Sequence, residues 1–165
     1  MDIQRKDGVS IGAADFSEQG KLGELLLEVC GSVWQRECAA AKNAGQDAPM
    51  YTDELMAADD FYFSNAELMN CCVFARYEDA IIGAVCVNPY TYALHFLVVR
   101  AEWRHKGIGR KLLKIAEKII KKYGGKSLNI QFSQAEEFAG ADTFFQKCGY
   151  VEVKRQCFYA GKIQE

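Results

Sequence analysis

The feature that most constrains this fold is a basic turn, with two glycines, between an apolar run and a helix-forming pattern. The apolar run covers residues 94–99, the turn covers 104–109, and an amphipathic stretch rich in lysine follows. Gly107 and Gly109 let another group approach the backbone closely. A helix N-terminus also offers unpaired N–H groups and a positive dipole end. The same glycines fit a plain tight turn, but the preceding strand and the cationic helix favour a phosphate ligand at one end of a sheet.

The residues after the turn narrow the kind of phosphate ligand. A dinucleotide-binding fingerprint needs a third glycine, and the position three residues after Gly109 is Leu112. A nucleoside-triphosphate loop needs Gly-Lys-Ser/Thr, whereas Arg110 and Lys111 follow Gly109 here. The remaining interpretation is a pyrophosphate held by backbone amides and cations without a metal ion.

Hydrophobic periodicity predicts strands and helices that alternate through the middle of the chain. A helical pattern from 17 to 44 carries a candidate break at Gly31-Ser32, and Ser64 with Glu67 forms a capping-box pattern for a short helix. The nearly all-apolar strand at 92–100 is expected to be central. We therefore expect an α/β (α+β) fold, a mixed sheet with helices on both faces, forming a single domain over residues 1–165. The other predicted elements are strands at 9–14, 71–77, 80–87, 127–132 and within 150–163, and helices at 107–123 and 135–147.

Charge is strongly segregated along the chain. Residues 100–126 hold ten lysines and arginines against two glutamates, whereas residues 1–99 hold six against fifteen acidic residues. One basic segment suits a local anionic ligand better than a long nucleic-acid track. Nucleic-acid binding through the lysine helix therefore ranks last among the function classes. The acidic half of the chain could attract a cationic substrate.

The cysteine and histidine pattern predicts no metal centre. The seven cysteines contain no C-x-x-C spacing and mostly lie in apolar runs, which is typical of buried free thiols in a reducing cytosol. His95 and His105 are the two histidines. The sequence also shows no 18-residue apolar run and no basic-then-apolar leader, so we expect a cytoplasmic protein without a membrane span.

Two motifs resemble the Gcn5-related N-acetyltransferase (GNAT) family. The family pattern of an apolar strand followed by Arg/Gln-x-x-Gly-x-Gly/Ala matches residues 97–109, which end in Arg104-His105-Lys106-Gly107-Ile108-Gly109. The segment Ala141 to Tyr150 matches the family's Ala-x-x-aromatic-aromatic-x-Lys-x-Gly-aromatic. The likeness covers about residues 71–155, including Ile82-Gly83. It implies the GNAT fold, with a mostly antiparallel sheet, residues 71–155 as the CoA-binding core and residues 1–70 as a variable acceptor-side part.

The resemblance implies transfer of an acetyl group from acetyl-CoA to a small-molecule or peptide amine. The amides of Arg104 to Gly109 would hold the CoA pyrophosphate, and backbone groups of Leu97 and Val99 would pair with the pantetheine arm. Lys111 or Lys147 could meet the adenosine phosphates, or both lysines could be simply solvated. Dimers are common in the family, which makes a homodimer compatible with the resemblance. The implied CoA-binding set is Leu97, Val98, Val99, Arg104, His105, Lys106, Gly107, Ile108, Gly109, Arg110, Lys111, Phe145 and Lys147.

Direct attack on a thioester needs a neutral amine, so a base must accept its proton. His95 is the candidate base, because its ordinary pKa near 6.5 suits proton abstraction at neutral pH and strand alternation places it on the face of Leu97. A hydrogen-bonded core histidine, with a water chain serving as the base, is the alternative. The amide near Leu97 would stabilise the tetrahedral oxyanion.

The usual general acid of the family is replaced. Phe145 stands where family members often carry a tyrosine, and Phe138 stands where they often carry an asparagine. A phenyl ring cannot donate a proton, which motivates a second hypothesis, a non-catalytic CoA-binding or sensing module. Candidate substitutes for the acid are Cys148, Tyr150 and Tyr159. The acceptor pocket is not identified: Tyr51, Phe61, Tyr62 and Phe63 could line it or fill the core, and Asp53, Glu78 and Asp79 are candidate amine-recognition groups.

Overall fold

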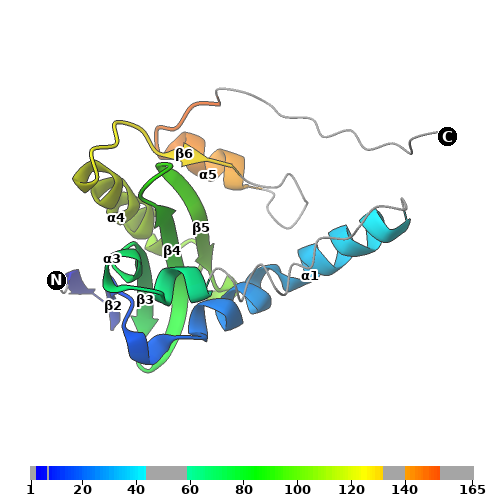
Figure 1. Cartoon of the computed structure of the whole chain (residues 1–165), viewed down its shortest axis with the longest axis horizontal. Coiled ribbons are helices and arrows are strands. Elements are labelled where there is room, and N and C mark those ends of the chain that lie inside the picture. Colours follow the sequence, from blue (N-terminus) through cyan, green and yellow to red (C-terminus); the bar gives the residue numbers. More distant parts are fainter. Residues whose placement is uncertain (1–2, 7, 44–58, 132–139, 153–165) are drawn as a thin grey trace. The chain divides into compact units, whose positions relative to one another are not determined.

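The computed structural model describes residues 3–6, 8–43, 59–131 and 140–152 (Figure 1). The chain groups into two compact units, each described by itself below. The first unit comprises residues 1–31 and 52–131, and the second comprises residues 32–51 and 132–165. Among the described helices, none combines the length and the apolar character that crossing a bilayer requires.

A six-stranded sheet forms the centre of the first unit, with the strands in sequence order. Neighbouring strands from β1 to β5 pair antiparallel, whereas β5 and β6 pair parallel. This confirms the predicted mixed, mostly antiparallel sheet. The strands are β1 (Ile3–Lys6), β2 (Val9–Ala13), β3 (Cys72–Tyr77), β4 (Ala80–Asn88), β5 (Ala93–Val99) and β6 (Asn129–Ile130).

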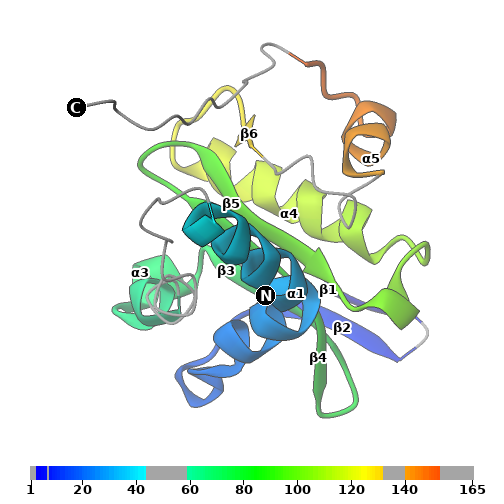
Figure 2. The ribbon, with the colours of Figure 1, turned by 90° about the vertical axis from the view of Figure 1, so that its right-hand side faces the viewer.

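Both faces of the sheet are covered, and β4 shows this most clearly. Its seven residues from Ile81 to Val87 are all buried although successive side chains point to opposite faces. A Cβ added at Gly83 would lie 3.5 Å from Leu112 of α4 (Ile108–Lys122), so Gly83 faces this helix. Figure 2 shows α4 behind the sheet and the start of α1 (Lys21–Asn43) in front of it.

The strand predicted to be central is not the most buried one. In β5, only Leu94 and Val98 are buried, whereas His95 is exposed and Leu97 is intermediate. The apolar run of β4 takes the central place because it has full-length antiparallel partners on both sides. β6 pairs with β5 only at Ala93 and Leu94.

Two local predictions about helices are wrong. Gly31-Ser32 does not interrupt α1, which is continuous from Lys21 to Asn43. A single glycine costs a helix only about 1 kcal/mol, and the apolar stripe of this long helix outweighs that cost. The short helix α3 (Ala66–Met69) exists, but its cap is Asn65, whose side chain accepts a hydrogen bond from the Leu68 N–H at 2.9 Å. Ser64 instead donates to the Phe61 carbonyl.

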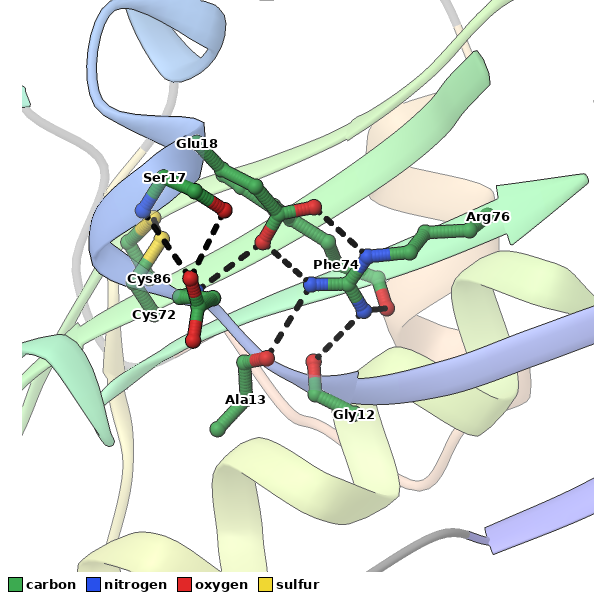
Figure 3. A network of polar contacts seen from close by, with 9 residues as sticks. Gly12, Ala13, Ser17, Glu18, Cys72, Phe74, Arg76 and Cys86 are labelled. Atoms are coloured by element: carbon green, nitrogen blue, oxygen red, sulfur yellow. Dashed lines mark hydrogen bonds and ion pairs between the residues drawn. The ribbon is translucent and has the colours of Figure 1, made fainter. Parts of the chain in front are cut away.

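A polar network fastens the 3-10 helix η1 (Phe16–Glu18) to β3 (Figure 3). The Arg76 Nε donates to Glu18 Oε1 at 2.8 Å, and the other Glu18 oxygen accepts the Asp15 N–H at 2.9 Å. The Asp15 side chain accepts the Ser17 N–H, and Asp15 and Glu18 together form a capping box. The Arg76 guanidinium also donates to the carbonyls of Gly12, Ala13 and Phe74. The segment that leads into α1 is therefore fixed to the sheet by a charged pair with several hydrogen bonds.

Candidate functional site

The predicted phosphate turn forms an open helix N-terminus. β5 ends at Val99, the 3-10 helix η2 (Ala101–Trp103) follows, and α4 begins after Gly107. Gly107 is the N-cap with φ 80°, and its position carries no side-chain cap hydrogen bond. His105 has φ 62°, a left-handed conformation in a non-glycine residue, which is unusual and often functional. Gly107 thus takes the left-handed backbone conformation that glycine permits in a turn.

The first N–H groups of α4 point out of this open end. The earliest hydrogen bond of the helix runs from the Lys111 N–H to the Gly107 carbonyl at 3.1 Å, so the N–H groups of Ile108, Gly109 and Arg110 precede it. The first turn contains no acidic residue, and space within 4 Å of a Cβ at Gly107 is empty. The arrangement provides backbone donors and a positive dipole end, which suit an anion.

Basic side chains surround the turn, and Lys106 and Arg104 contact neighbouring groups of the first unit. The Lys106 Nζ lies 4.6 Å from the centre of the Trp103 ring, a cation–π contact. The Arg104 Nε donates to the Val99 carbonyl at 3.1 Å, and the Arg104 N–H donates to the Ala101 carbonyl. The Arg104 N–H thus bonds back to the 3-10 helix η2. The backbone donors that remain for an anion are those of the residues after Arg104. Arg110 and Lys111 are exposed on the first turn of α4.

The backbone of β5 presents hydrogen-bonding groups on the side away from β4. The Arg100 N–H donates to the Ile82 carbonyl at 2.9 Å, so alternate residues (100, 98, 96) bond β4. Leu97 and Val99 therefore direct their N–H and C=O groups to the opposite side. Among the described strands, β6 pairs with β5 no further than Leu94, so no described strand covers that side of Leu97 and Val99. The outward backbone groups of Leu97 and Val99 have the orientation that pairing with an extended chain requires.

His95 lies at a bulge in β5, which the sequence did not reveal. Phe96 pairs with Cys86 and Leu94 pairs with Val87, which leaves His95 as an extra residue between them. The bulge turns its side chain to the face of Phe96, whose ring centre lies 5.7 Å away. Leu97, paired with Val85, lies on the opposite face with Gly83 and α4. The prediction that His95 shares a face with Leu97 is therefore wrong, because simple alternation fails at a bulge.

The His95 ring contacts residues that the sequence placed in either the core or the acceptor pocket. Its Nδ1 lies 3.0 Å from the Tyr62 hydroxyl oxygen, and the Phe61 ring centre lies 6.2 Å from the ring. Partial burial of the ring lowers the pKa of His95, because the charged imidazolium loses part of its solvent. Tyr62 and Phe63 are buried, Phe61 is intermediate, and Tyr51 and Asp53 lie outside the described residues. Tyr62 and Phe63 therefore belong to the core, while Phe61 borders the histidine.

The sequence missed two buried or paired groups near the site. Asp59 is 1% exposed, and its Oδ2 accepts the Gly20 N–H at 2.7 Å before α1, while its buried Oδ1 has no hydrogen-bond partner. Arg100 pairs with Glu28 of α1 at 2.9 Å. No sequence signal links these pairs, because each joins residues far apart in the chain. Glu78 and Asp79, the candidate amine-recognition groups, are exposed at the β3–β4 turn.

The predicted acid position lies in the second unit. Phe145 belongs to α5 (Ala141–Lys147), and its ring centre lies 5.2 Å from that of Phe144 and 6.0 Å from that of Tyr150. Cys148 is a free thiol, whereas Phe138 and Tyr159 lie outside the described residues. Lys147 ends α5, where a cation suits the helix dipole. Within the described part of the chain, no group of three or more histidine, cysteine or acidic residues is arranged to hold a metal ion.

Comparison with known proteins identifies the family. The family model described as "Acetyltransferase (GNAT) family" matches residues 32–150. The chain belongs to the GNAT acetyltransferase family, and this match confirms the predicted family, fold and enzyme class. A comparison with curated protein sequences finds no match.

Solved structures share the fold along nearly the whole chain. Aminoglycoside N-acetyltransferase AAC(6')-Iy in complex with CoA has a TM-score of 0.67 and 14% identity, covering 98% of this chain and 99% of that one. Aminoglycoside 6'-N-acetyltransferase AAC(6')-Ih from Acinetobacter baumannii has a TM-score of 0.62 and 14% identity, covering 95% and 100%. A GNAT acetyltransferase from Staphylococcus aureus Mu50 has a TM-score of 0.61 and 18% identity, covering 89% and 86%.

Proposed function

We propose that the protein transfers an acetyl group from acetyl-CoA to an amine by direct attack in a ternary complex. The observation that carries the proposal is the open N-terminus of α4, placed directly after a strand with outward-facing backbone groups at Leu97 and Val99. A diphosphate and an extended pantetheine arm need these two features in this order. The CoA complex of the structurally similar AAC(6')-Iy supports the assignment of the co-substrate.

The proposed CoA site uses main-chain donors first and charges second. The amides from His105 to Gly109 would bind the diphosphate, with Arg110 and Lys111 adding positive charge. The side of Leu97 and Val99 turned away from β4 would pair with pantetheine amides, as an added strand does. Val98 leaves the implied set, because its backbone bonds β4 and its side chain is buried. Phe145 and Lys147 are proposed to bind CoA solely on their positions in the family motif.

The proposed reaction moves one proton and one acyl group. The neutral amine nitrogen attacks the thioester carbonyl carbon, and the Leu97 N–H stabilises the negative oxygen of the tetrahedral intermediate. The carbon–sulfur bond then breaks, and the electron pair leaves with the CoA sulfur. His95 accepts the proton that the amine loses. The thiolate takes a proton from water, since Phe145 offers none, and the hydroxide that remains takes back the proton from His95, so that one proton moves from nitrogen to sulfur overall.

The acceptor is proposed to be a cationic amine on a small molecule or a peptide. Two structurally similar proteins are named as aminoglycoside acetyltransferases, which supports the small-molecule choice. The acidic balance of residues 1–99 also suits a positively charged acceptor.

We further propose a single cytoplasmic domain. The family match runs through both compact units, and free cysteines, four of the five described ones buried, are typical of a reducing compartment. A homodimer is also proposed, on the family resemblance alone.

A non-catalytic CoA-binding module is the second candidate, and Phe145 at the usual acid position favours it. The deciding experiment measures CoA thiol release from acetyl-CoA over a panel of polyamines, aminoglycosides and peptide N-termini. Transferase function predicts amine-dependent release that His95→Gln lowers at least tenfold. CoA binding by calorimetry with no release above background for any amine would support the module instead.

A further inference from the structure

The two ring nitrogens of His95 have different surroundings. The Nδ1 atom lies 3.0 Å from the Tyr62 hydroxyl oxygen, within hydrogen-bond distance. The residue as a whole remains exposed to solvent. The ring is thus held through Nδ1, and Nε2 is the nitrogen that could contact the substrate amine.

Tyr62 is itself rigidly held. It is 0% exposed and lies in the helical residues 59–63, which the Asp59 carboxylate ties to the start of α1 through the Gly20 N–H. Its ring meets the Phe61 ring edge to face at 5.0 Å. Burial, followed by the nearby thiols of Cys86, Cys72 and Cys71, raises the pKa of the Tyr62 phenol far above its usual range. The hydroxyl therefore stays protonated and keeps one fixed position in the core.

The bulge in β5 brings the histidine to this hydroxyl. Phe96 and Val98 lie on the Tyr62 face of the sheet because they pair with Cys86 and Ala84. The extra residue at the bulge joins them there, and the Tyr62 and His95 rings meet at 85° with centres 5.9 Å apart. Without the bulge, alternation would point residue 95 toward α4. The bulge thus sets the direction of the His95 side chain, and the Tyr62 hydroxyl bonds its ring.

We propose that Tyr62 is the positioning residue of His95: its hydroxyl oxygen accepts a hydrogen bond from Nδ1–H and so leaves the Nε2 lone pair as the working base. The proposal rests on the function proposed above. It resembles the general arrangement in which a third group orients a catalytic base.

The proton balance agrees with this assignment. In the resting state, the neutral ring carries its proton on Nδ1, and this N–H donates a hydrogen bond to the Tyr62 hydroxyl oxygen. When Nε2 takes the proton of the attacking amine, the imidazolium keeps the Nδ1–H bond to the same oxygen. Apart from the proton gained at Nε2, the ring and the hydroxyl keep their positions in the two states, and the phenol remains neutral in both. The opposite tautomer, with the proton on Nε2, could not accept a proton at that atom.

The test compares Tyr62→Phe with the control Tyr92→Phe, which removes the hydroxyl of a half-buried tyrosine that donates to the Tyr123 carbonyl at 3.3 Å. Tyr62→Phe should lower kcat about tenfold, the worth of one hydrogen bond, and leave the KM for acetyl-CoA unchanged. Tyr92→Phe should leave both unchanged. In a His95→Gln background, Tyr62→Phe should have no further effect on kcat, because the two residues act as one unit.

A second measurement does not depend on activity. The chain has two histidines, so imidazole nitrogen NMR of the CoA-free protein, assigned with His105→Gln, reports on His95 directly. The wild type should carry the neutral-ring proton on Nδ1, and Tyr62→Phe should mix the tautomers and lower the pKa of His95. A wild-type proton on Nε2, or the same tautomer ratio and pKa in Tyr62→Phe, would overturn the proposal. Absence of thiol release by the wild type would instead reject the proposed function.

Discussion

Gly83 of β4 lies against the backbone of Val98 in β5, and a Cβ at Gly83 would come within 2.9 Å of the Val98 carbonyl oxygen. It would also approach Val99 to 3.3 Å and Leu112 of α4 to 3.5 Å. The glycine thus sets how closely β5 approaches β4. It does so beside Leu97 and Val99, the residues whose outward backbone groups form the proposed pantetheine site.

Gly83→Ala should therefore displace β5 or strain it. We expect a loss of about 1–3 kcal/mol in the free energy of unfolding, typical of overpacking a buried site, together with weaker CoA binding. Urea unfolding and calorimetry measure the two effects. Gly12→Ala is the matched control, because a Cβ at Gly12 meets only the Arg76 Nη1 at an ordinary 3.8 Å. Equal stability of the two variants would show that the close approach does not matter.

The pH dependence of activity should report on His95. Partial burial of the ring lowers its pKa, so the imidazole stays neutral to a lower pH than a fully solvated histidine does. The neutral, basic form of His95 should thus be lost only as the pH falls below about 6.5, the ordinary pKa of histidine. The fall of kcat/KM with acid should therefore lie below about pH 6.5. Steady-state profiles of the wild type and His95→Gln measure this. The same limb in both enzymes would remove His95 from the mechanism.

The Glu18–Arg76 pair should make stability depend on pH in the acid range. Burial raises the pKa of Glu18, but hydrogen bonds from Arg76 and the Asp15 N–H, with the Arg76 charge, outweigh it and leave the pKa lowered. A lowered pKa in the folded state adds stability above the unfolded-state value and loses it as the pH falls through the folded one. Glu18→Gln should cost about 1 kcal/mol at neutral pH and progressively less below about pH 4. A difference in melting temperature that does not change with pH would contradict this.

Restoring a hydroxyl at the usual acid position should raise turnover. Phe145→Tyr adds a proton donor to an otherwise equal ring, next to Tyr150. We expect a severalfold higher kcat at alkaline pH, where water protonates the leaving thiolate more slowly, and an unchanged KM for acetyl-CoA. Phe144→Tyr, one position earlier on α5, is the control. Equal rates for wild type and Phe145→Tyr would mean that protonation of the thiolate does not limit turnover.

The sequence predicted the parts of the molecule that depend on local patterns. The turn into α4 follows from its glycines, and the β3–β4 hairpin follows from two apolar runs around a short polar turn. The orientation of His95 could not be predicted, because strand alternation holds only where no bulge occurs. Its partner Tyr62 lies 33 residues earlier, and only the folded chain brings the two together. The continuity of α1 through Gly31 was missed because a single glycine lowers helix stability without having to end the helix.

The most direct test of the account is calorimetric titration of CoA into the wild type and Gly109→Asp. The aspartate lies in the first turn of α4, where it should maintain or raise the melting temperature while repelling a bound diphosphate. Lys118→Gln makes the same change in net charge on the exposed face further along α4 and serves as the control. We predict wild-type binding, near-normal binding by Lys118→Gln, and an affinity at least about a hundredfold weaker for Gly109→Asp. Wild-type affinity in Gly109→Asp, or no binding by the wild type at millimolar CoA, would contradict the diphosphate site at this helix.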